Sequence, residues 1–144
     1  MIDRVILDTN VISAALRGDW PAATQEWFAA TREAHALTVI TVMELVHGVQ
    51  RMPAGRKRSE IAAAIDAVVS SAHIVDFSSA AAIAAGAFRA DRAAVGRPLD
   101  LADAQIAGIC AVSGALLATR NTRDFEGLGL SVVDPCSRCW RSWA

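Results

Sequence analysis

The chain has 144 residues, 53% hydrophobic and 20% charged, which is long and apolar enough for one folded domain. Fourteen Lys and Arg residues nearly balance fifteen Asp and Glu residues, giving a formal net charge of −1. This balance excludes a uniformly basic surface, so any nucleic-acid site has to come from a local patch.

The start of the chain has no secretory signal pattern, because Asp3 and Arg4 interrupt it and no small-residue cleavage site follows. The longest uncharged run, from Ala104 to Thr119, is shorter than a membrane span. We therefore expect a cytoplasmic protein without a membrane partner.

The first third of the chain alternates between strand and helix patterns. Val5 to Leu7 is a short apolar run with β-branched residues, which predicts a buried strand. Thr9 to Leu16 predicts a helix, and Trp20 to Ala34 a second one with Asp19 as its N-cap. Leu37 to Ile40 predicts the second strand.

The same alternation continues to the end. Helices are predicted from Thr41 to Arg51, Arg56 to Ser71, Ser78 to Ala94 and Asp100 to Ser113. Strands are predicted at His73 to Phe77, Leu116 to Ala118 and Leu130 to Val133. Strands that alternate with helices imply an α/β fold whose mostly parallel sheet, of four or five strands, has helices on both faces.

Four acids, Asp8, Glu44, Asp103 and Asp124, have settings that place them beyond the carboxyl ends of these strands, where α/β proteins bind ligands. The segments around the first three are core-like and poor in basic residues, and no charge follows Asp103 before Arg120. A buried carboxylate is costly unless it is paired or bound to a metal. Converging carboxylates also repel one another, and a divalent cation would remove that repulsion.

The type of ligand indicates the metal and the chemistry. Carboxylate oxygens suit Mg²⁺ or Mn²⁺. Such sites chiefly serve phosphoryl chemistry, in which a metal lowers the pKa of a water molecule and no side-chain nucleophile is needed. The sequence therefore predicts a metal-dependent hydrolase of phosphate esters.

Each acid also has a purely structural interpretation. Asp8 and Asp100 fit helix N-caps, and the acid one turn after Asp100 would be favoured by the helix dipole. Thr41-x-x-Glu44 fits a capping box, and Asp124 fits a turn. A metal site accounts for all four acids at once, whereas these interpretations need a separate reason for each.

Four segments, in this order, resemble the motifs of PIN-domain ribonucleases. They are Leu7-Asp8-Thr9-Asn10-Val11-Ile12-Ser13, Glu44-Leu45-Val46-His47-Gly48, Asp103-Ala104-Gln105-Ile106-Ala107 and Thr119-Arg120-Asn121-Thr122-Arg123-Asp124-Phe125. The segment that begins at Glu44 is similar to the E-L-x-x-G motif of that family. Nearly the whole chain resembles the VapC and FitB toxins of VapBC and FitAB type toxin–antitoxin pairs.

The resemblance implies a PIN domain at residues 1–135, with a Rossmann-like α/β/α sandwich, and a tail at residues 136–144. It implies an endoribonuclease toxin that uses Mg²⁺ or Mn²⁺ and an activated water to hydrolyse RNA. The catalytic metal ligands carried over are Asp8, Glu44, Asp103 and Asp124. The implied partners are RNA, a cognate antitoxin and a second copy of the chain, with a possible higher assembly.

Further polar residues are candidates for secondary roles. Those expected to orient water or phosphate are Asn10, Thr119 and Asn121. Those expected to contact the RNA backbone are Arg51, Arg56, Lys57 and Arg120, with a solvated turn as the alternative for the first three. The tail residues Trp140 and Trp143, with two arginines, suit stacking on bases or packing on a partner.

Two other functions fit part of the pattern. Asp8-Thr9-Asn10 loosely resembles the D-x-D motif of metal-dependent phosphatases, with Asn in place of the second acid. A degenerate PIN-like domain that only binds RNA or protein is the second alternative. Loss of acids would indicate it, and all four acids are present.

Overall fold

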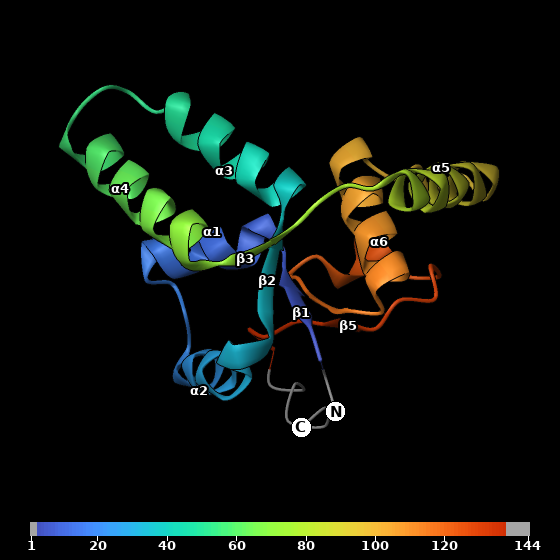
Figure 1. The fold of residues 1–144 in the computed structure, drawn as a ribbon, viewed down its shortest axis with the longest axis horizontal. Coiled ribbons are helices and arrows are strands. Elements are labelled where there is room, and N and C mark those ends of the chain that lie inside the picture. Colours follow the sequence, from blue (N-terminus) through green and yellow to red (C-terminus); the bar gives the residue numbers. More distant parts are fainter. Residues whose placement is uncertain (1–2, 138–144) are drawn as a thin grey trace.

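A computed structural model describes residues 3–137, which form an α/β fold around a five-stranded sheet (Figure 1). The strands are β1 (Val5–Leu7), β2 (His35–Thr38), β3 (His73–Val75), β4 (Leu116–Ala118) and β5 (Val132–Val133). They lie in the order β3-β2-β1-β4-β5, and every pair is parallel. The predicted fold class is confirmed, and β1, the first strand in sequence, is the centre of the sheet.

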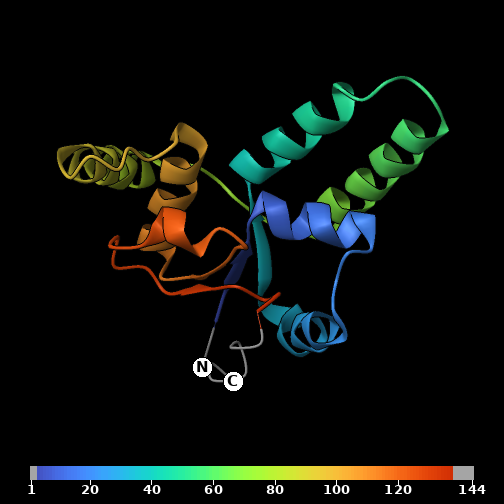
Figure 2. The ribbon, with the colours of Figure 1, turned by 180° about the vertical axis from the view of Figure 1, so that it is seen from behind.

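Helices cover both faces of this sheet. They are α1 (Thr9–Arg17), α2 (Ala22–Thr31), α3 (Val39–Gln50), α4 (Arg56–Ser71), α5 (Ser79–Ala94) and α6 (Leu101–Ser113), with short 3-10 turns at Arg32–Ala34 and Thr122–Phe125. Figures 1 and 2 show α5 and α6 on one side of the sheet and α1 to α4 on the other. Within residues 3–137, no helix is long and apolar enough to cross a membrane.

The central strands β1 and β4 are apolar and fully buried because each face of the sheet has its own core. Side chains alternate along a strand, so β1 sends Ile6 to one face and Val5 and Leu7 to the other. Ile6 packs into a cluster built mainly from α5 and α6, and its neighbours pack into a second cluster with α1 to α4. With both faces buried, strands of three residues are enough to anchor the sheet.

The predicted boundaries of the second strand and of the helix before it are wrong. The sequence predicts a strand at Leu37 to Ile40, but β2 ends at Thr38, whose hydroxyl accepts a hydrogen bond from the Thr41 backbone N–H at 3.1 Å. This side-chain cap starts α3 at Val39, and it outweighs the β-propensity of the residues that follow. The preceding helix is shorter than expected.

The N-terminal cap predicted for α2 is also wrong. Asp19 does not cap the helix, because the N-cap position is Pro21 and makes no side-chain capping bond. Instead, the Asp19 carboxylate accepts a hydrogen bond from Arg17 Nε at 3.1 Å. The third and last predicted strands are shorter in the structure, whereas Ser78 caps α5 as predicted.

Candidate active site

Asp8 lies at the carboxyl end of the central strand and is only 5% exposed. It is also the N-cap of α1, since its Oδ1 accepts a hydrogen bond from the Thr9 backbone N–H at 2.7 Å. Its Oδ2 accepts from the Thr119 hydroxyl at 2.8 Å and from Asn10 Nδ2 at 3.3 Å. The carboxylate is therefore fixed in place by groups from both ends of the chain.

Thr119 connects the loop after β4 to the start of α1. Its buried hydroxyl donates to Asp8 and accepts from Asn10 Nδ2 at 3.2 Å and from the Asn121 backbone N–H at 3.1 Å. The side-chain oxygen Oδ1 of Asn10 accepts in turn from the Arg120 backbone N–H at 3.1 Å. The side chains of Asn10 and Thr119 thus hold the two loops in a fixed relation.

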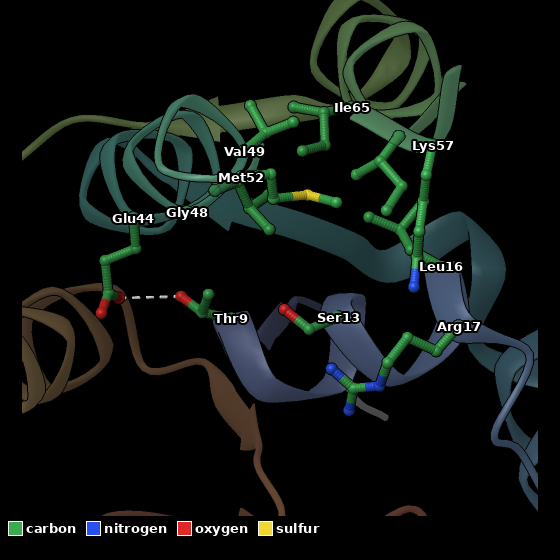
Figure 3. Close-up of a pocket in the computed structure, with 12 residues that line it drawn as sticks. Thr9, Ser13, Leu16, Arg17, Glu44, Gly48, Val49, Met52, Lys57 and Ile65 are labelled. Atoms are coloured by element: carbon green, nitrogen blue, oxygen red, sulfur yellow. Dashed lines mark hydrogen bonds between the residues drawn. The ribbon is translucent and has the colours of Figure 1, made fainter. Parts of the chain in front are cut away.

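Glu44 lies on α3, beyond the helix start that Thr38 caps. Its Oε1 accepts a hydrogen bond from the Thr9 hydroxyl at 2.8 Å, which ties α3 to α1 (Figure 3). The capping-box interpretation of Thr41-x-x-Glu44 is wrong, because Thr41 lies inside the helix rather than at its cap. Glu44 is free of a capping role and faces the same edge of the sheet as Asp8.

Asp103 occupies the first turn of α6, where it is partly buried. Asp100 caps this helix, as its structural interpretation predicted, and its Oδ2 accepts from the Ala102 backbone N–H at 3.1 Å. Asp103 itself makes no capping bond. It is therefore the acid that α6 presents to the site.

One cleft, with a volume of about 350 Å³, brings together five of the seven residues predicted to hold the metal or to orient water and phosphate. It is lined by Asp8, Thr9, Asn10, Ser13, Arg17, Glu44, Asp103 and Asn121. Three of the four acids, from the start of α1, from α3 and from α6, thus share a single cavity at the carboxyl edge of the sheet. Thr119 is buried behind them.

Asp124 lies outside this lining. It is exposed on the 3-10 turn Thr122–Phe125, although its charge still raises the pKa of both Asp8 and Asp103. Asp124 is therefore close enough for its charge to affect Asp8 and Asp103, but it does not line the cleft.

Arg92, which the sequence analysis did not single out, holds the turn that carries Asp124. This arginine of α5 is only 8% exposed. Its Nη1 donates to the Asp124 carbonyl oxygen at 2.7 Å and to that of Glu126 at 3.3 Å, and its Nε donates to the Arg97 carbonyl oxygen at 3.0 Å. A buried cation that binds only carbonyl oxygens gives no local sequence signal.

Burial and neighbouring carboxylates disfavour the ionisation of two acids of the site, Asp8 and Asp103. Burial raises the pKa of Asp8, hydrogen bonds to its oxygens oppose this rise, and the charges of Glu44 and Asp124 add to it. Burial, together with the neighbouring carboxylates and foremost Asp8, raises the pKa of Asp103 to about 7. A bound cation would reverse these effects, because it favours the ionised carboxylates.

The donor chemistry of the cleft fits a hard divalent cation. Carboxylate and amide oxygens are the ligands of Mg²⁺ and Mn²⁺, and uncompensated acids at one edge of a sheet suit them. Within residues 3–137, however, no three Asp, Glu, His or Cys side chains lie close enough together to hold an ion as they stand. Metal binding would require Asp103 to lose its proton and Glu44 to share its oxygen now bonded to Thr9.

Three lining residues of α1, namely Thr9, Ser13 and Arg17, were not predicted as site residues. They follow one another at intervals of four, so they lie on one face of the helix. This helical spacing, which starts at the residue after Asp8, was the available signal. Arg17 is the one basic group of the cleft lining, and it leaves its terminal nitrogens available because its bond to Asp19 uses Nε.

The residues predicted to contact RNA lie around the cleft rather than in it. Arg51, Arg56 and Lys57 are exposed near the turn between α3 and α4, and Arg56 pairs with Glu60 at 2.8 Å. Arg120 is exposed next to the cleft.

The PIN-domain family profile matches residues 5–129, so the chain belongs to the PIN-domain family. A tRNA(fMet)-specific endonuclease VapC of Shigella flexneri is 32% identical over 126 residues, which cover 88% of this chain and 92% of the relative. The resemblance to VapC ribonucleases is thus confirmed.

Solved structures agree with this assignment. DNA-bound VapBC from Salmonella typhimurium has a chain that superposes with a TM-score of 0.82 at 28% identity, covering 94% of this chain and all of the other. FitAcB from Neisseria gonorrhoeae gives a TM-score of 0.78 at 27% identity, with 91% and 97% covered. Both belong to the toxin–antitoxin complexes that the four motifs indicated.

Proposed function

We propose that this protein is a metal-dependent endoribonuclease and the toxin of a toxin–antitoxin pair. The observation that carries the proposal is the cleft that brings together Asp8, Glu44 and Asp103 from three distant segments, and in which burial and neighbouring carboxylates raise the pKa of Asp8 and Asp103. The similarity to a VapC endonuclease and to VapBC and FitAB structures supports RNA as the substrate and an antitoxin as the partner.

Asp8, Glu44, Asp103 and Asp124 are the residues we assign to hold Mg²⁺ or Mn²⁺. When bound, the cation would lower the pKa of the attacking water and offset the charge of the phosphodiester. Asp124 approaches from the turn that Arg92 holds. Because Asp124 lies outside the cleft lining, its contribution to metal binding depends more than that of the other acids on the position of this turn.

The other polar groups of the cleft position the substrate. Arg17 offers a guanidinium to the phosphate, opposite the acids. The amide group of Asn121 suits a water or a phosphate oxygen. The Asn10 amide already donates to Asp8 and Thr119, so only its Oδ1 can accept a further bond from a water, and Thr119 fixes Asp8 from behind. These residues act by orientation and charge, so none of them needs to be a nucleophile.

The proposal extends to assembly and location. We assign residues 1–135 to the PIN domain, whose last turn is joined to α2 by a 2.8 Å bond from the Thr24 hydroxyl to the Pro135 carbonyl oxygen. The predicted role of Trp140 and Trp143 falls outside the described residues. We propose a homodimer that binds its antitoxin in the cytoplasm, where RNA is accessible.

The test compares RNA cleavage by wild type, Asp8→Asn and Asp66→Asn, each with Mg²⁺, Mn²⁺ or EDTA. Asp66 is an exposed acid of α4 and serves as the matched control. We expect EDTA or Asp8→Asn to lower cleavage by on the order of 100-fold or more, the size typical of losing an electrostatic contact in a site. Full activity of a folded Asp8→Asn protein would refute the assignment.

The same preparations separate the two alternatives. A phosphatase of the D-x-D type would form a covalent aspartyl-phosphate on Asp8, which can be trapped and detected by mass spectrometry. A binding module would retain RNA in a gel-shift assay but show no heat of Mn²⁺ binding by calorimetry.

A further inference from the structure

A second pocket adjoins the acidic cleft between α1, α3 and α4, with a volume of about 300 Å³ (Figure 3). Its walls are mainly aliphatic and consist of Leu16, Leu45, Val49, Met52, Ile61 and Ile65. Thr9, Ser13, Arg17 and Glu44 line both this pocket and the cleft, so the two cavities are continuous. A molecule in the cleft can extend directly into the pocket.

Gly48, the last residue of the E-L-x-x-G motif, keeps this pocket open. It lies on α3 one turn after Glu44 and lines the pocket, and a Cβ placed on it would meet no atom within 4 Å. Its φ is not positive, so neither the backbone nor close packing requires glycine here. Glycine within a helix is about 1 kcal/mol less favourable than alanine. The glycine thus costs the helix some stability and leaves the volume beside it in the pocket unfilled.

Two cations border the pocket. Figure 3 shows the Lys57 side chain reaching from α4 toward α1, and the Arg17 guanidinium turned toward Ser13. Within the described residues, the Lys57 ammonium makes no hydrogen bond or ion pair. The single acid of the lining is Glu44, on the side shared with the cleft. The pocket thus combines an apolar interior with a positive border.

We propose that this pocket receives the base of the nucleotide next to the scissile phosphate, with Arg17 and Lys57 contacting the flanking phosphates. This inference rests on the proposed ribonuclease function. Single-stranded RNA is recognised through bases that leave the stack and pack on aromatic rings or on the plane of an arginine, while cations follow its backbone. Arg17 is the planar group of this lining, and the aliphatic walls would bury the rest of the base. A hydrophobic peptide would also fill the aliphatic walls, but it would leave Lys57 without a complementary charge, whereas Arg17 already pairs with Asp19 at 3.1 Å.

The nature of the walls indicates how the base would be selected. Apart from Ser13 and Thr9, the lining offers no neutral side-chain hydroxyl or amide to read a base edge. We therefore expect selection by the size and burial of the base rather than by a hydrogen-bond pattern.

The experiment compares wild type with Gly48→Leu and Gly86→Leu. Leucine at position 48 fills the pocket without a backbone clash, and Gly86 on α5 is an exposed control whose Cβ would likewise meet no atom within 4 Å. The probes are the four ribonucleoside 5′-monophosphates and ribose 5-phosphate, with Mg²⁺. Binding is followed by the NMR shifts of the Met52 and Ile61 methyl groups, and circular dichroism confirms folding.

We expect the nucleotides, but not ribose 5-phosphate, to shift these methyl signals in wild type. Gly48→Leu should weaken nucleotide binding at least tenfold, and Gly86→Leu should leave it unchanged. Equal shifts with the base-free sugar phosphate, no shift with any nucleotide, or unaltered binding by folded Gly48→Leu would each overturn the proposal. The pocket would then be left to a peptide segment of a partner.

Cleavage by wild type, measured in parallel, separates this inference from the nuclease assignment. A wild-type protein that cleaves RNA in a metal-dependent manner, but binds no nucleotide at the Met52 and Ile61 methyl groups, would refute the base pocket alone. Absence of metal-dependent cleavage concerns the acids of the cleft instead.

Discussion

Gly108 of α6 and Gly48 of α3 lie on helices that cover opposite faces of the sheet, and the two have opposite surroundings. A Cβ on Gly108 of α6 would collide with the carbonyl oxygen of Ala81 on α5 and approach the Cβ of Ala85 to 3.1 Å. A Cβ on Gly48 of α3 would meet nothing within 4 Å. One face is therefore closed by helix-to-helix contact, whereas the other keeps a pocket. The same residue type serves packing in one case and space in the other.

The largest effect on stability is expected from a substitution at the contact between α5 and α6, on the closed face. Gly108→Ala should lower the free energy of unfolding by about 3 kcal/mol, because the added methyl group forces α5 away from α6 and this overrides the gain in helix propensity. Urea unfolding measures the change. An unchanged midpoint would mean that the two helices can separate easily, and that the faces do not differ as described.

Substitutions of Arg92 test how α5, on the closed face, holds the turn that carries Asp124. Arg92→Gln should destabilise the protein by about 2 kcal/mol, since it leaves carbonyl oxygens of the turn without their charged donor. It should also weaken Mn²⁺ binding measured by calorimetry, because Asp124 loses its support. Arg92→Lys should recover part of both effects, and Arg89→Gln, at an exposed position on the same helix, should change neither.

Asp103 of α6 lines the cleft together with residues of α1 and α3. Its raised pKa makes the stability of the protein depend on pH. In EDTA, folded Asp103 keeps its proton up to a pKa of about 7, whereas the unfolded group ionises near 3.8. The folded state therefore binds more protons between these values, so stability falls as the pH rises from about 4 to 7 and then levels off. Solvent screening limits the loss to about 1–2 kcal/mol.

Asp103→Asn should reduce this slope in urea unfolding curves recorded across the same pH range, and the part that remains would come from Asp8, whose pKa is also raised. Metal binding should follow the opposite trend, since the affinity for Mn²⁺ should increase as the pH passes through 7 and the proton leaves. Parallel pH curves for wild type and Asp103→Asn would contradict the assignment.

The smallest effect is expected on the open face. Gly48→Ala should raise the free energy of unfolding by about 0.5–1 kcal/mol, through helix propensity alone, because the methyl group meets no neighbour. The substitution is the same as the one at position 108, yet the predicted sign is reversed. A destabilised Gly48→Ala protein would show that α3 packs more closely than the structure indicates.

The periodicity of apolar residues was sufficient to predict the parallel sheet. The rule that ligands bind beyond the carboxyl ends of its strands was sufficient to predict that Asp8, Glu44 and Asp103 lie at one edge of it. They failed where a single side chain decides the local structure, as when the Thr38 hydroxyl ends β2 and starts α3. Long-range contacts such as those of Arg92 lie beyond any local pattern. The open space beside Gly48 also could not be predicted, because it depends on the distance between three helices.

The bond between the Thr119 hydroxyl and Asp8 spans 111 positions of the chain, and β1 pairs with β4 over a similar separation. During synthesis, the first strand leaves the ribosome long before its partner, and the centre of the sheet stays incomplete. A nascent chain, or a fragment that ends before β4, therefore has Asp8 and Glu44 but no assembled site. The site of such a protein can be completed only after almost the whole chain has been translated.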